Sequence, residues 1–235
     1  MAADDLQYVE RDGEAVPRQT HVQKVFLLPP NILIGTAGVG THPKIGYESC
    51  TWIAAFIISQ TGDAIHRPDQ VAGALRVKMQ ETFNVLESMP DDMLWETYKP
   101  GDRVVTYFVA GYADSFRRPY FYEVWTEVNA KGDGLIYFAE QRTVRQLFWI
   151  GEDQFWTRAA NGSGEEPYTS NRLGIYREIE SKVPAGTIPA SLRDAALSLA
   201  TLIKLEAKFN DKKVGSNVAI AVIDRTTKKF TGLAL

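Results

Sequence analysis

The order of strand-type and helix-type segments is the feature that most constrains how this chain can fold. Residues 25–28 and 32–34 are short apolar runs joined by Pro29-Pro30-Asn31, which predicts a hairpin. Two helical patterns follow, at about 48–60 and from Pro68 to near Pro90. The remaining predicted elements are strands at 103–113, 118–129, 134–141 and 144–151, helices at 171–182 and 191–209, and strands at 217–224 and 228–235.

Strand blocks therefore alternate with pairs of helices. Single βαβ alternation, which would predict a parallel doubly wound sheet, does not occur. The order favours an α+β protein built as a four-layer αββα sandwich, with two stacked antiparallel sheets each covered outside by a helix pair. Within the first 20 residues, Arg11, Asp12, Gly13 and Pro17 predict a loop between two short strands, and a polar loop is expected at 38–45.

The helical patterns also predict which faces are buried. In the first helix the apolar stripe is Trp52, Ala55, Phe56 and Ser59. In the second it is Leu75, Met79, Phe83 and Leu86. In the last it is Leu192, Ala196, Leu199, Ile203 and Ala207, after a start at Ser191 and Asp194 that is similar to a capping box.

Composition excludes several classes of protein. The 235 residues contain enough apolar material for one large core, and no repeat or linker divides them, so we expect a single domain over 1–235. One cysteine, Cys50, cannot form an internal disulfide, and the three histidines lack the spacing of metal ligands. A net charge of −3 and the absence of a basic stripe argue against nucleic acid. No apolar run reaches the ~18 residues of a membrane span, and no leader is recognisable. A cytoplasmic protein without a cofactor is expected.

The glycine-rich stretch Gly35-Thr36-Ala37-Gly38-Val39-Gly40 allows more than one interpretation. It lacks the Gly-Lys-Ser/Thr ending of a P-loop, and it does not fit the dinucleotide fingerprint G-x-G-x-x-G. A flexible turn before a helix is one interpretation. The other is a turn whose backbone N–H groups form an oxyanion hole.

Several short segments, taken in order, resemble a known family. These are "MAAD" at 1–4, "KVF" at 24–26, "NILIGTAGVG" at 31–40 before a helix, and "NDKKVGSNVAIAVID" at 210–224. Together they are similar to proteasome β-type subunits, which belong to the N-terminal nucleophile (Ntn) hydrolases. The resemblance extends over nearly the whole chain and is weakest at 95–150. It implies the αββα fold, threonine-peptidase chemistry and a ring of several copies that takes unfolded peptides as substrate.

The resemblance also implies site residues. Asp4 and Lys24 take the places of the family's charge pair, Gly38 that of the oxyanion donor, and Asp211 that of the second aspartate. Val214 stands where the family has a serine, and Ser216 is the nearest hydroxyl beyond it. We expect the Lys24 ammonium to be buried against the Asp4 carboxylate. Taken singly, Asp4 also fits a solvated terminal acid, Lys24 a charge at a strand edge, and Asp211 a loop residue.

The family's terminal threonine and the strand that it begins have no counterpart in this sequence. A protein made from this sequence alone is therefore expected not to hydrolyse peptides, either because the sequence is short at its front or because it is a non-catalytic relative. The empty strand position is expected to be filled by residues 4–20 or by a neighbouring subunit. The alternatives are a structural ring subunit, or an aromatic-rich binding module that uses Tyr120, Tyr122 and Trp125 as a stacking face. For these three aromatics, a place in the core or in an oligomer interface is the favoured interpretation.

Overall fold

The computed structural model describes residues 22–60, 66–113, 119–142, 199–201, 203, 204, 207 and 217–221, and describes the backbone alone at 2–4, 7–11, 14–19, 222–224 and 229–234. The chain divides into two compact units. One comprises residues 24–145 with 223–231, and the other residues 1–23, 146–222 and 232–235. The elements include helices and antiparallel sheets, so the α+β class is confirmed, whereas the single domain stays a prediction.

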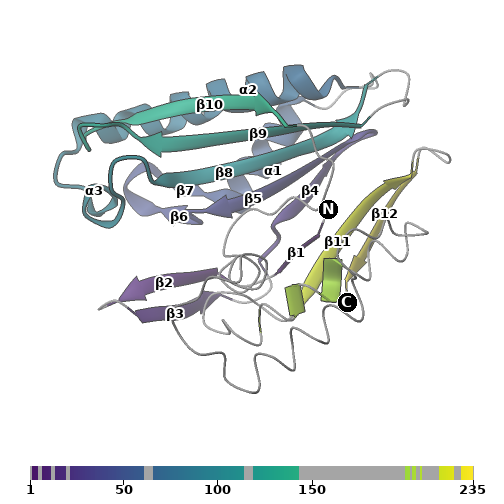
Figure 1. Cartoon of the computed structure of the whole chain (residues 1–235), viewed down its shortest axis with the longest axis horizontal. Coiled ribbons are helices and arrows are strands. Elements are labelled where there is room, and N and C mark those ends of the chain that lie inside the picture. Colours follow the sequence, from purple (N-terminus) through teal and green to yellow (C-terminus); the bar gives the residue numbers. More distant parts are fainter. Residues whose placement is uncertain are drawn as a thin grey trace, which may run out of the picture. The chain divides into compact units, whose positions relative to one another are not determined.

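A five-stranded antiparallel sheet is the centre of the first unit (Figure 1). Its strands are β4 (Val25–Leu28), β5 (Ile32–Gly38), β8 (Arg103–Tyr112), β9 (Pro119–Val128) and β10 (Leu135–Gln141). The order across the sheet is β10-β9-β8-β5-β4. The predicted hairpin and the three predicted middle strands are therefore confirmed, and the fourth, at 144–151, lies outside the described residues.

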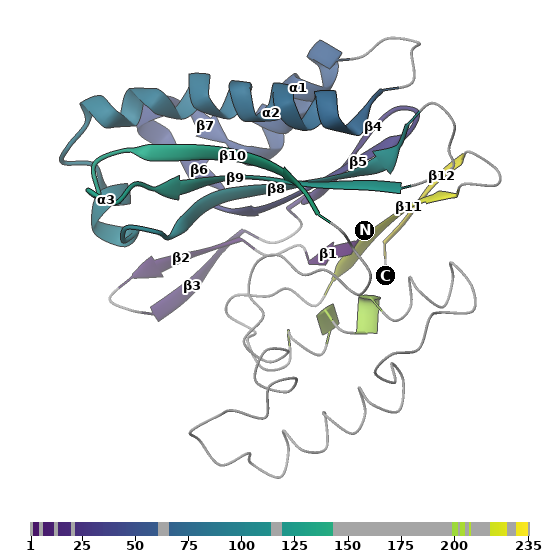
Figure 2. The same ribbon diagram turned by 45° about the horizontal axis from the view of Figure 1, so that its top comes forward.

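Two helices lie over one face of this sheet, as Figure 2 shows. They are α1 (Ser49–Gln60) and α2 (Pro68–Phe83), and α2 continues into the 3-10 turn η2 (Asn84–Ser88). Proline at the first position of α2 lacks the N–H that a helix start leaves unpaired, which favours a helix beginning there. The stripe predicted for this helix is confirmed, because its four residues are all fully buried: Leu75, Met79, Phe83 and Leu86.

The stripe predicted for α1 is partly wrong. Phe56 is buried, but Ala55 and Ser59 are exposed, and the residue that packs most deeply is Ile53. The helix contains no charged residue, so no polar face marks its orientation in the sequence. Packing on the sheet selects the buried face instead.

The segment between β5 and α1 has more order than the polar loop predicted at 38–45. It contains β6 (Thr41–His42), the 3-10 turn η1 (Pro43–Ile45) and β7 (Tyr47–Glu48), and β6 pairs with β7. A five-residue helix, α3 (Met93–Thr97), was not predicted. Asp92 caps its start, because the carboxylate accepts a hydrogen bond from the Leu94 amide at 3.0 Å.

One sheet combines elements from both ends of the chain, and it belongs to the second unit except for residues 223–231, which fall in the first. Strands β1 (Ala2–Asp4), β11 (Val218–Asp224) and β12 (Lys229–Ala234) form a three-stranded sheet in the order β1-β11-β12. The predicted strands at 217–224 and 228–235 are confirmed. Helical residues within 199–207 pack on this sheet, because Ile203 and Ala207 share a buried cluster with Val218. The rest of the helix predicted at 191–209 and the helix predicted at 171–182 lie outside the described residues.

The expectation that residues 4–20 fill a strand position in this sheet is not met by the described strands. Residues 7–19 form a separate hairpin, in which β2 (Gln7–Arg11) pairs with β3 (Glu14–Gln19). Ala2–Asp4 pairs directly with β11, with Asp4 opposite Val218. Pro17 lies inside β3 rather than in a loop.

Candidate functional site

The hairpin of β4 and β5 brings two of the predicted site residues to the same end of the sheet. Lys24 precedes β4 and is half-buried, and its carbonyl accepts a hydrogen bond from the Thr36 amide at 3.0 Å. Gly38 ends β5 two residues beyond Thr36. The open end of one hairpin therefore carries both the candidate ammonium group and the candidate oxyanion donor.

Gly38 has a backbone conformation that requires glycine. Its φ is +96°, in the region that L side chains rarely adopt. A Cβ atom built on it would lie 2.2 Å from the carbonyl oxygen of Val104 on β8. The next amide, that of Val39, donates to the same Val104 carbonyl at 2.9 Å. Close approach of the two strands thus fixes this turn, and the residue at its centre is exposed.

A buried chain of hydroxyl groups lies beside this end of the hairpin. The hydroxyls of Tyr47 and Tyr107 are 2.8 Å apart, and Thr36, opposite Tyr107 in the β-ladder, hydrogen-bonds to Tyr107 through its side chain. Trp52 of α1 stacks on the Tyr107 ring, with centroids 5.4 Å apart. Burial raises the pKa of both phenols well above the usual value, so both stay neutral near pH 7.

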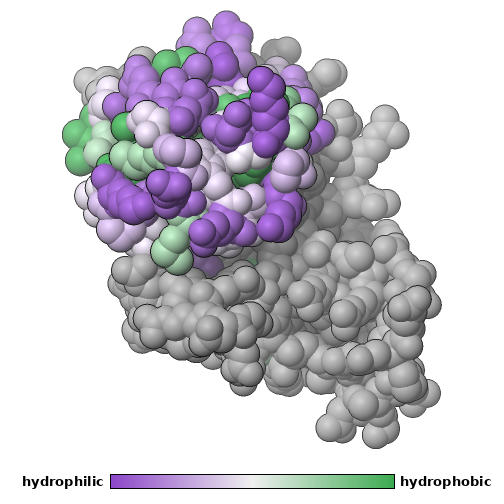
Figure 3. All heavy atoms as spheres, turned by 90° about the vertical axis from the view of Figure 1, so that its left-hand side faces the viewer, coloured by the Kyte–Doolittle hydropathy of each residue, from purple (hydrophilic) through white to green (hydrophobic). Residues whose placement is uncertain are grey.

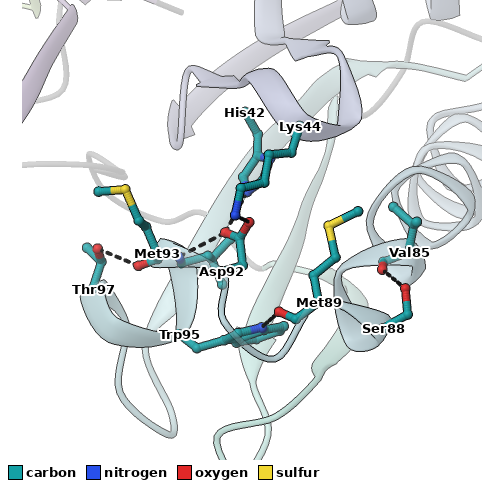
Figure 4. A network of polar contacts seen from close by, with 10 residues as sticks. His42, Lys44, Val85, Ser88, Met89, Asp92, Met93, Trp95 and Thr97 are labelled. Carbon is teal, nitrogen blue, oxygen red and sulfur yellow. Dashed lines mark hydrogen bonds and ion pairs between the residues drawn. The ribbon is translucent and has the colours of Figure 1, made fainter.

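A charged cluster holds the segment that follows Gly38 (Figure 4). The Nε2 atom of His42 lies 2.9 Å from one carboxylate oxygen of Asp92, and the Nζ atom of Lys44 lies 2.9 Å from the other. The Asp92 side chain is 3% exposed. Burial opposes its ionisation, but hydrogen bonds from Lys44, from the Leu94 amide and from His42 outweigh burial and lower the pKa of Asp92 to about 2.

Sequence patterns alone contain little sign of this cluster. Asp92 stands directly before the apolar run Met93-Leu94-Trp95, which is a recognisable helix-capping position. Nothing in the spacing links it to His42, 50 residues earlier. Only the fold brings the two together.

Three of the predicted site residues are not described with side chains. The backbone of Asp4 is placed in β1, and Asp211 and Ser216 lie outside the described residues. Lys24 is half-buried rather than fully buried, and its contact with the Asp4 carboxylate stays a prediction.

The three aromatic residues of the alternative binding module do not form one stacking surface. Side chains alternate along a strand, so Tyr120 and Tyr122 of β9 share one face and Trp125 lies on the other. Tyr122 packs against the core beneath the helices. Trp125 is buried, stacks on Phe138 and lies under the Arg103 guanidinium. The interpretation of these residues as a single stacking face is therefore wrong, and Trp125 belongs to the interior.

Two further observations concern the described residues. No three His, Cys, Asp or Glu side chains among them gather closely enough to hold a metal ion. None of the helices in the described part of the chain has both the length and the hydropathy to cross a membrane.

Comparison with known proteins adds no assignment. The sequence matched none of the protein-family models against which it was scanned, and a search of curated proteins found no match.

Proposed function

We propose that this chain is a proteasome-β-like domain of the Ntn-hydrolase type, and that it belongs to the machinery of peptide-bond hydrolysis. Under this proposal the two units stack through their sheets as a four-layer αββα sandwich. Support comes from each unit taken by itself, since each contains a sheet with helical residues packed on one face. The proposal includes a cytoplasmic ring of several copies that takes unfolded peptides as substrate.

The observation that carries the proposal is the geometry of the β4–β5 hairpin. A lysine stands where one strand begins, and a glycine with φ of +96° stands where the paired strand ends. The proposed reaction needs a cation and a backbone N–H near one reacting group, and this hairpin brings a lysine and a glycine to the same end of the sheet. The close contact with Val104 fixes the glycine before any substrate binds, which is what an oxyanion donor requires.

The proposed reaction assigns separate chemical roles to a terminal nucleophile, to Lys24 and to Gly38. In the reaction that the family resemblance implies, a threonine hydroxyl at the N-terminus attacks the peptide carbonyl and passes its proton to the α-amine of the same residue. Met1 and Ala2 of this sequence carry no such hydroxyl. The Lys24 ammonium favours the negative charge that develops on the attacking oxygen. The Gly38 N–H donates to the oxyanion, and collapse of the intermediate releases the amine and leaves an ester.

The test uses the protein purified with its natural N-terminus, whose first residue is established by mass spectrometry. Hydrolysis of fluorogenic peptides is measured for the unchanged protein, for Lys24→Ala and for the control Lys78→Ala, whose side chain is 51% exposed on α2. If the natural first residue is a threonine, we expect hydrolysis by the unchanged protein and by the control, and a loss of at least about a hundredfold in Lys24→Ala. Protein that begins at Met1 or Ala2 should hydrolyse no peptide. Absence of hydrolysis by protein with a terminal threonine, full activity in Lys24→Ala, or hydrolysis by protein that begins at Met1 or Ala2 would overturn the proposal.

A further inference from the structure

The segment between Gly38 and α1 is too small to hold its own conformation. Its strands β6 and β7 have two residues each, and a two-stranded hairpin is marginal in water even when it is longer. Gly46, with φ of +64°, and η1 form its tip. At its base the Ser49 amide donates to the Gly40 carbonyl at 2.8 Å. This segment, residues 39–48, therefore needs an anchor elsewhere in the fold.

Asp92 supplies two bonds to this segment. One carboxylate oxygen meets His42 and the other meets Lys44, so the two bonds fix both the position and the rotation of the tip (Figure 4). The His42 side chain is 10% exposed and that of Lys44 is 56% exposed. A charge-assisted bond to a buried carboxylate is stronger than one between exposed groups. Both contacts meet the same buried carboxylate, and the His42 side chain is the more shielded from solvent.

The other side of the anchor is itself fixed. The Asp92 amide donates to the Met89 carbonyl at 3.1 Å, and the indole Nε1 of Trp95 donates to the same carbonyl at 2.9 Å. Leu94 is buried in the core beneath the helices. Asp92 is thus tied to the core through its own backbone, its capping bond and its neighbours.

The surface around α3 gives no sign of another role for this cluster. The face shown in Figure 3 carries mainly hydrophilic side chains among its described residues, with small apolar areas between them. Met93 on α3 is 73% exposed. An isolated exposed apolar side chain needs no partner.

We propose that Asp92 is a positioning residue. Through His42 and Lys44 it holds residues 39–48, and through them it maintains the turn at Gly38. The effect of Asp92 on catalysis rests on the proposed function, because the Gly38 N–H contacts a substrate only if the protein is a peptidase of this type. Its effect on the conformation of the segment does not depend on that function.

The first test measures amide hydrogen exchange in Asp92→Asn. Asparagine caps helices as well as aspartate, and its Oδ1 can keep the bonds to Leu94 and His42, which share one oxygen, whereas the bond from Lys44 to the other oxygen is lost. Loss of a charge-assisted bond corresponds to about tenfold to hundredfold faster opening. We expect this acceleration at the Gly46 and Ser49 amides, and none at the Gly132 amide, which is bonded within the β9–β10 turn.

Matched variants keep the test decisive. Asp69→Asn removes a carboxylate from an exposed ion pair with Arg67 and leaves the segment untouched. Lys44→Met removes one bond at an exposed position, so it answers the question if Asp92→Asn does not fold, and Lys44→Arg should restore normal exchange. The inference would be overturned if folded Asp92→Asn exchanged its amides at the unchanged rate. The same result in Lys44→Met decides the question if only that variant folds. Equal acceleration in Asp69→Asn would also overturn the inference.

The second test separates this inference from the proposed function. In protein with its natural N-terminus, Asp92→Asn should lower kcat about tenfold or more while KM changes little, because the oxyanion donor acts in the transition state. A rise in KM at unchanged kcat would refute a role through Gly38. If unchanged protein with a terminal threonine hydrolyses no peptide, the proposed function fails, and the exchange data still decide whether Asp92 positions the segment.

Discussion

Replacing Gly38 by alanine tests how closely β5 and β8 must approach. The new Cβ would lie 2.2 Å from the Val104 carbonyl oxygen, a distance at which one of the two strands has to move. That movement also weakens the bond from the Val39 amide to the same oxygen. The substitution therefore combines backbone strain with a steric clash.

The magnitude follows from three contributions. An L residue at this φ costs about 1–2 kcal/mol, and the clash with the lost hydrogen bond costs about 2–3 kcal/mol. Alanine also lowers the conformational entropy of the unfolded chain, which offsets about 0.4–1 kcal/mol of this loss. The expected net loss in the free energy of unfolding is about 2–4 kcal/mol.

Gly101→Ala is the matched control. Gly101 has nearly the same φ, +88°, but nothing lies within 4 Å of its added Cβ. Its expected loss is about 0–1.5 kcal/mol, so the difference between the variants isolates the clash. At about 2–4 °C per kcal/mol, Gly38→Ala should melt roughly 4–12 °C below Gly101→Ala. Equal melting temperatures would refute the close approach of the two strands.

Three further substitutions have defined outcomes. Asn31→Ala removes a fully buried amide that bonds to both backbone groups of His66, and should lower the free energy of unfolding in urea by about 2–4 kcal/mol; a loss under 0.5 kcal/mol would contradict these contacts. Glu123→Gln weakens a buried carboxylate between two partly exposed arginines, so about 1–3 kcal/mol should be lost, and high salt should reduce the difference from the unchanged protein. Because the pKa of Asp92 is lower in the folded protein than in the unfolded chain, where it is near 4, its ionisation stabilises the fold fully above about pH 4, and this contribution is lost as the pH falls toward 2. Acid should therefore destabilise the unchanged protein more steeply than Asp92→Asn. Parallel plots of stability against pH would show that the ion pairs are absent.

Elements with a strong local pattern could be predicted from the sequence. The second helix combines a proline start with a regular apolar stripe, and its four stripe residues are all buried. The strands of the central sheet are rich in β-branched and aromatic residues, and the structure reproduces their predicted positions. These signals are local, so no information about distant residues is needed to interpret them.

Features that depend on distant contacts could not be predicted. The buried face of α1 was predicted wrongly at Ala55 and Ser59. The helix has no charged residue to mark its solvent-exposed face, so packing against the sheet determines which face is buried. The cluster around Asp92 joins segments 50 residues apart, and a short helix like α3 depends on such packing rather than on its own propensity. At the candidate site, Lys24 and Gly38 were found through their order in the sequence, whereas the contact with Val104 that fixes Gly38 required the fold.

The hydroxyl pair of Tyr47 and Tyr107 also limits the alkaline range of the protein. Because burial raises the pKa of each phenol above its unfolded value near 10, the two groups contribute stability in full below that pH, and the contribution disappears as the pH rises further. A phenolate in this core would lose its hydration, and the hydrogen bond from the second phenol at 2.8 Å would offset only part of that cost. Ionisation of these phenols and unfolding of this unit are consequently coupled in base, so the core around α1 becomes less stable as the pH rises above about 10.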